Sequence, residues 1–155
     1  MLLMTTLSGS LNKPSVNKIL IFLGILISLI GFLDATYLTI TYFQGVLPTC
    51  SVVHGCEKVL LSSYAAIFSV PVALFGALYY LAIFVGLVAF LDTAKLNILR
   101  TVSLGTTIGL IASGYFFFLQ LVVIEAWCQF CIVSLITSTL LFVVGMLIYR
   151  SLPKV

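Results

Sequence analysis

Charged side chains are scarce in this sequence, and that scarcity limits the class of protein. Only 7% of the 155 residues are charged, whereas 63% are hydrophobic. A soluble domain usually carries about 25% charged residues, so an ordinary water-facing surface is excluded. The sequence also has no G-x-G-x-x-G nucleotide fingerprint, and its single histidine argues against haem ligation. We therefore expect residues 1–155 to form one membrane domain.

The sequence instead has long stretches with little or no charge. A helix that crosses a bilayer needs about 20 mainly apolar residues, and it satisfies its own backbone polar groups. Four stretches meet that length, at residues 19–43, 70–91, 97–124 and 129–149. The pattern predicts an all-α integral membrane protein, a four-transmembrane-helix bundle. A tail over residues 1–17 and a loop over residues 44–69 complete it.

The basic residues predict how the bundle sits in the membrane. With four spans, both termini and the middle turn lie on one side. Six of the seven Lys and Arg residues flank that side, and only Lys58 lies opposite. These six are Lys13, Lys18, Lys95, Arg100, Arg150 and Lys154. The positive-inside rule predicts a multi-pass cell-membrane protein with both termini in the cytoplasm. Orientation accounts for the net charge of +3, so we expect no nucleic-acid partner.

The four cysteines all fall at the other, extracytoplasmic end of the predicted bundle. Cys50 and Cys56 lie in the loop after the first span, whereas Cys128 and Cys131 open the last span. Disulfides form and persist on that side, which in a eukaryote would be the lumen of the endoplasmic reticulum. Four cysteines allow three pairings, and they suit structural disulfides, redox exchange or a zinc site. Structural zinc mostly stabilises small soluble modules, so we expect no metal.

The C-x-x-C of Cys128 and Cys131 favours redox exchange over a structural disulfide. Free amides and the helix dipole at a helix N-terminus stabilise an anion, which lowers a thiol pKa and produces thiolate. Such a pair needs an electron acceptor, and without a nucleotide motif the candidate is a lipid-soluble quinone. Aromatic residues at the outer end of the third span, among them Phe117, are candidate quinone contacts. Lipid contact and packing is the alternative for most of that group.

Two further titratable residues are candidates for a supporting role. Asp34 is a lone carboxylate inside the first span, and intramembrane acids commonly face a cavity and mark function. It is a candidate for proton transfer to the quinone, with a neutral or hydrogen-bonded structural acid as the alternative. His54 lies between the loop cysteines. When protonated it would favour thiolate there, and a solvated loop residue is the alternative.

Together, these motifs resemble the vitamin K epoxide reductase family. The matching pattern is Cys50, Cys56, the run EKVLLSSYAAIFSVPVALFG that follows, and WCQFC at the start of the last span. The resemblance covers roughly residues 19–149. It implies a four-helix bundle around a quinone, either menaquinone, ubiquinone or a related compound.

The resemblance also implies roles for single residues. The two loop cysteines are a shuttle pair, Cys56 passes electrons to Cys128, and Cys131 faces the quinone. Ser62 matches a family serine that contacts a quinone oxygen or positions the loop, and capping a short helix is the alternative. The apolar run 59–68 is expected to lie on the membrane as a short interfacial helix.

The implied function is that of a prokaryotic-type, quinone-dependent thiol oxidoreductase that generates disulfides for exported proteins. The sequence ends at Val155 without a thioredoxin-like domain, so a separate extracytoplasmic thioredoxin-like protein is the expected partner, beside membrane lipid. Leu135 stands where vertebrate members carry a tyrosine, which argues against epoxide reduction. The alternatives are a reductase of vitamin K quinone or its epoxide, and a non-enzymatic membrane protein with structural disulfides.

Overall fold

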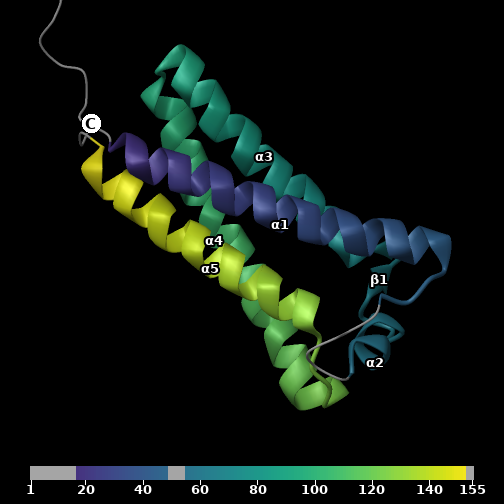
Figure 1. Ribbon diagram of the computed structural model, residues 1–155. Helices are drawn as coiled ribbons and strands as arrows, with labels where there is room; N and C mark the ends of the chain where they lie inside the picture. The colour runs from purple at the N-terminus through teal and green to yellow at the C-terminus, as the bar shows by residue number, and fades with distance from the viewer. Residues whose placement is uncertain (1–16, 49–54, 153–155) are drawn as a thin grey trace, which may run out of the picture.

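The computed structural model describes residues 17–48 and 55–152, which are mostly helical (Figure 1). In order, the elements are α1 (Lys18–Gln44), α2 (Cys56–Leu60), β1 (Ala66–Ile67), β2 (Val70–Pro71), α3 (Val72–Thr93), α4 (Leu96–Phe118), the π-helical turn η1 (Leu119–Ile124) and α5 (Gln129–Ser151). Within these ranges, four helices are long and apolar enough to cross a membrane: α1, α3, α4 together with η1, and α5. The predicted four-helix membrane fold is therefore confirmed.

Local sequence signals set the ends of the long helices. The side chain of Asn17 accepts a hydrogen bond from the backbone N–H of Ile19 at 3.0 Å and so caps the start of α1. Gly45 ends the same helix in the left-handed conformation, with φ of 65°. Ala94 takes a similar conformation, with φ of 51°, between α3 and α4. These ends give α1 and α3 lengths that suit a membrane span.

The long helices form a ring in which each packs on two neighbours. Helix α1 contacts α3 and α5, and α4 contacts the same two helices from the other side. Tyr80 lies at the centre, 1% exposed. Its hydroxyl donates a hydrogen bond to the carbonyl of Ser134 at 3.0 Å and lies 2.8 Å from the hydroxyl of Thr137. Gly31 of α1 leaves room for the ring, because a Cβ there would overlap it.

The two ends of the bundle differ in composition. The start of α1, the turn between α3 and α4, and the end of α5 lie together, away from α2, β1 and η1 (Figure 1). That first end carries Lys18, Lys95 and Arg150, whereas the second carries Lys58. The structure thus places these residues as the sequence predicted, and which end faces the cytoplasm stays a prediction.

The expected short helix between the first two spans is present as α2, but it covers only the start of the run 59–68. Within residues 59–68, only Val59 and Leu60 are helical, and turns then lead into the hairpin of β1 and β2. Phe68 and Ser69 form the hairpin turn with φ of 49° and 65°, so a helix cannot continue through them. The second long helix begins at residue 72 instead of 70, because Val70 and Pro71 form β2 and Pro71 is extended, with ψ of 135°.

Candidate functional site

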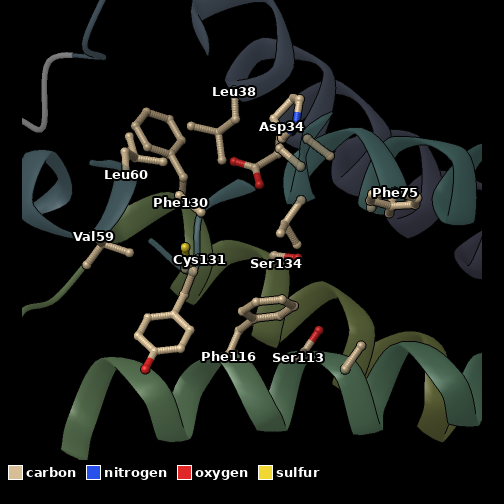
Figure 2. Close-up of a pocket in the computed structure, with 18 of the residues that line it drawn as sticks. Asp34, Leu38, Val59, Leu60, Phe75, Ser113, Phe116, Phe130, Cys131 and Ser134 are labelled. Atoms are coloured by element: carbon tan, nitrogen blue, oxygen red, sulfur yellow. The ribbon is translucent and has the colours of Figure 1, made fainter. Parts of the chain in front are cut away.

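A cavity of about 320 Å³ opens at the end of the bundle that carries α2 and η1 (Figure 2). Its walls come from all four long helices, from η1, and from α2 with the segment that follows it. Leu38, Phe75, Phe116 and Phe130 make much of the wall apolar. Few polar groups reach the cavity, so each of them bears on what it can bind.

Cys131 brings a thiol to this cavity. It lies in the first turn of α5, and Figure 2 shows its side chain among the lining residues, between Phe130 and Phe116. Cys131 is a free thiol, and so is Cys128. The residue predicted to face the quinone therefore borders this cavity.

Cys128 lies behind Cys131 and has no exposed surface. It belongs to a buried cluster that also contains Cys56, Val59, Leu119 and Ile124. Cys56, at the start of α2, is disulfide-bonded and 1% exposed. The structure thus brings Cys56 and Cys128 into one cluster, although they are 72 residues apart in the sequence. Cys50 and His54 lie outside the described residues.

Gly55 makes this approach of the two segments feasible. It has φ of 133°, a conformation that side chains with a Cβ rarely adopt. A Cβ at Gly55 would also lie 3.1 Å from the backbone oxygen of Trp127 and 3.3 Å from the Cβ of Ala126. The residue before Cys56 therefore packs against the residue before Cys128. No sequence pattern pointed to this glycine.

The setting of Cys128 favours its thiolate. A hydrogen bond from the Cys131 side chain, with further ones from the backbone N–H groups of Cys131 and Phe130, lowers the pKa of Cys128 from 9.0 to about 7. Burial and the negative charge of Asp34 act in the other direction. The hydrogen bond from Cys131 is the largest of these effects, and the backbone N–H groups at the start of α5 add to it.

Two of the three remaining predicted residues line the cavity, and the third contacts Trp127 instead. Asp34 and Ser62 both line the cavity. The Ser62 hydroxyl donates a hydrogen bond to the carbonyl of Val59 at 2.7 Å, so it also closes the end of α2. Phe117 instead contacts Trp127, with ring centroids 6.0 Å apart, and α4 presents the adjacent Phe116 to the cavity. The proposed functional roles of all three stay predictions.

Two polar groups of the cavity have no hydrogen-bond partner among the described residues. One is Oδ2 of Asp34, and the other is the hydroxyl of Tyr79, and both atoms are buried. Tyr79 lies against Gly109, where any larger residue would collide with its hydroxyl. Tyr79 was not a predicted site residue, because a tyrosine within an apolar run looks like a packing residue.

Comparison with known proteins supplies the deciding observation. The profile of the vitamin K epoxide reductase family matches residues 22–146. This chain belongs to the vitamin K epoxide reductase family. Comparison with curated proteins gave no match. As a member of the vitamin K epoxide reductase family with four helices suited to a membrane, the chain is a multi-pass membrane oxidoreductase.

Members of the vitamin K epoxide reductase family are quinone-linked, and the cavity suits such a ligand. A quinone is a flat apolar ring with two carbonyl oxygens that accept hydrogen bonds. The cavity has apolar walls, the thiol of Cys131, and the Tyr79 hydroxyl, a buried donor without a partner in the part of the chain that the structure describes. Buried polar groups are normally hydrogen-bonded, so the Tyr79 hydroxyl and the Asp34 oxygen, which lack partners among the described residues, fit the polar atoms of such a ligand.

Proposed function

We propose that this protein is a quinone-dependent thiol oxidoreductase that generates disulfides for exported proteins. One observation carries the proposal. Cys131 borders the apolar cavity, while Cys128 is buried in one cluster with the disulfide-bonded Cys56. Cys131 thus faces the cavity, whereas Cys128 lies near the disulfide-bonded Cys56.

The first step exchanges electrons with a soluble partner. A dithiol of a separate thioredoxin-like protein attacks the disulfide of Cys50 and Cys56, so the partner leaves oxidised and the loop pair becomes a dithiol. Cys56 thiolate then attacks the sulfur of Cys128 in the Cys128–Cys131 disulfide. A Cys56–Cys128 bond forms, the Cys128–Cys131 bond breaks, and Cys131 leaves as thiolate.

Cys50 completes the internal transfer by attacking Cys56. This restores the loop disulfide and leaves Cys128 and Cys131 as thiols, which is the state of Cys56, Cys128 and Cys131 in the structure. The lowered pKa of Cys128 assists this step, because a thiolate of low pKa is the better leaving group. The C-x-x-C pair must then lose two electrons and two protons to become a disulfide again.

When bound, a quinone supplies an acceptor for those two electrons and two protons. Tyr79 would hold one of its oxygens by donating the hydrogen bond that its buried hydroxyl lacks within the described ranges. Asp34, whose side chain points toward Ser134 and Cys131 in Figure 2, is placed to receive or release a proton beside the thiol. The apolar walls exclude water from Cys131.

We further propose that the cavity end faces the extracytoplasmic side. Lys18, Lys95 and Arg150 lie at the other end of the described chain, as the positive-inside rule requires of a cytoplasmic face. Cys56 and Cys128 are too buried to serve as labels. In a cysteine-free background, Ser63→Cys should react with an impermeant maleimide on intact cells, and Ala94→Cys only after lysis. The reverse pattern would overturn this orientation.

Cysteine variants test the relay itself. Cys50→Ala should abolish oxidation of a thioredoxin-like partner but spare oxidation of a small dithiol that reaches Cys128 and Cys131 directly. Cys131→Ala should abolish both activities. If Cys50→Ala lost small-dithiol activity as completely as Cys131→Ala, the serial order of the two pairs would be wrong.

A further inference from the structure

Gln120 makes an unusual set of contacts immediately before the C-x-x-C. It lies in η1, where α4 widens into a π-helical turn, and its side chain is 4% exposed. Its carbonyl accepts the backbone N–H groups of Glu125 and Ala126. Its side-chain Oε1 accepts the backbone N–H of Cys128 at 3.0 Å. One residue thus holds both ends of the segment that leads into α5.

The bond to Cys128 satisfies a group that has no other evident acceptor. Cys128 is the N-cap of α5, with φ of −114° and ψ of 121°, so its N–H precedes the helical hydrogen-bond ladder. The residue has no exposed surface, so solvent does not reach this N–H. On its other side, the Cys128 carbonyl accepts the N–H of Ile132 at 3.1 Å. Gln120 and Ile132 together fix both peptide groups of Cys128.

The orientation of that first turn controls the chemistry of the Cys128 sulfur. The backbone N–H groups of Phe130 and Cys131 donate hydrogen bonds to it and help to lower its pKa. Hydrogen bonds of this kind depend steeply on angle. A rotation of the Cys128 peptide would therefore turn its sulfur away from these donors, even if α5 stayed intact.

We propose that Gln120 is a positioning residue for the redox pair, which holds the Cys128 amide so that the first turn of α5 directs its N–H groups at the Cys128 sulfur. The hydrogen bond of Gln120 is to the Cys128 backbone N–H, so it acts through the backbone of Cys128. π-Helical turns are frequent at functional sites, and this one puts the amide side chain where it reaches Cys128. The inference holds whatever molecule receives the electrons.

The Gln120→Met variant tests the proposal, because methionine keeps the length of the side chain but supplies no comparable acceptor. The full-length reduced protein, free of quinone and partner, is titrated by the ultraviolet absorbance of thiolate. A matched protein that also carries Cys128→Ser gives the background. Asp34 from α1 and Cys131 from α5 also influence this thiol, and both are unchanged in the comparison.

The thiolate fraction of Cys128 at pH 7 should fall at least about twofold in Gln120→Met, because the sulfur loses its backbone N–H donors while the donor from Cys131 stays. Val123→Met, on an exposed residue of the same π-helical turn, should leave the fraction unchanged. An unchanged fraction in a folded Gln120→Met protein would overturn the proposal. Activity with a quinone plays no part, so this outcome leaves the proposed function standing.

A measurement on the unmodified protein keeps the proposal testable if Gln120→Met does not fold. In ¹⁵N- and ¹³C-labelled protein, a scalar coupling across the hydrogen bond should connect the amide nitrogen of Cys128 with the side-chain carbonyl carbon of Gln120. Its presence would establish the contact on which positioning depends. Its absence would refute the proposal.

Discussion

Replacing Cys131 by alanine should weaken the ionisation of Cys128. The hydrogen bond from the Cys131 side chain is the largest of the effects that bring the pKa of Cys128 from 9.0 to about 7. That difference corresponds to about a hundredfold in the ratio of thiolate to thiol at a given pH. Without this donor, the remaining backbone hydrogen bonds must offset burial and the charge of Asp34 alone. We therefore expect a pKa well above 7 in Cys131→Ala.

Cys131→Ser is the matched control, because its hydroxyl still donates a hydrogen bond to the Cys128 sulfur. At pH 7, about half of the Cys128 thiols should be ionised in the reduced wild-type protein. We expect a similar fraction in Cys131→Ser and a fraction at least about threefold smaller in Cys131→Ala. Thiolate absorbance over a pH titration, corrected with a Cys128→Ser protein, measures all three. Equal pKa values in the alanine and serine variants would refute the assigned cause.

Two other substitutions follow from the packing and the charges. Gly31→Ala should lower the stability of the detergent-solubilised protein by about 1–3 kcal/mol, since the added Cβ overlaps the buried ring of Tyr80. Gly114→Ala, which meets nothing within 4 Å, should be neutral or stabilising, and equal thermal unfolding of both variants would contradict this packing. Asp34→Asn should lower the pKa of Cys128 below its value of about 7, because the carboxylate charge opposes the thiolate. A thiolate titration in which this variant shows an unchanged or higher pKa would mean that the charge of Asp34 does not raise the pKa of Cys128.

Composition and cysteine spacing were sufficient to predict much of this fold. Charge is so rare that each long apolar stretch ends close to where its helix ends, and the spans expected at 19–43 and 129–149 differ from α1 and α5 by at most two residues at each end. Asp34 stood out for the same reason, as a single acid in a charge-free helix. The structure places it on the cavity wall.

The sequence could not predict which aromatic side chains point into the cavity. Helix α4 is apolar on both its lipid-facing and cavity-facing sides, so no polar stripe marks which aromatic side chain turns inward. The sequence pointed to Phe117 as a quinone contact, whereas its neighbour Phe116 lines the cavity. Tyr79 was missed because its candidate role rests on a hydroxyl that lacks a partner among the described residues, which only the three-dimensional structure reveals.

The contacts that assemble the redox pair also depend on long-range geometry. Gly55 and Gln120 carry no motif, and their roles arise from a close backbone approach to Trp127 and a hydrogen bond to Cys128. The π-helical turn that contains Gln120 leaves no signature in an apolar segment. The hairpin at residues 66–71 likewise interrupts a stretch whose composition suits a helix or a membrane surface.

The central claim is that the four cysteines deliver electrons to a quinone through Cys131. Its most direct test is to mix purified, reduced protein with ubiquinone, menaquinone or vitamin K epoxide without oxygen and count the free thiols. The account predicts that one of the two quinones removes thiols in pairs from the wild-type protein and none from Cys131→Ala, with quinol as the product. Thiol loss with the epoxide alone would identify an epoxide reductase instead. No thiol loss with any of the three would contradict the account and favour a membrane protein with structural disulfides.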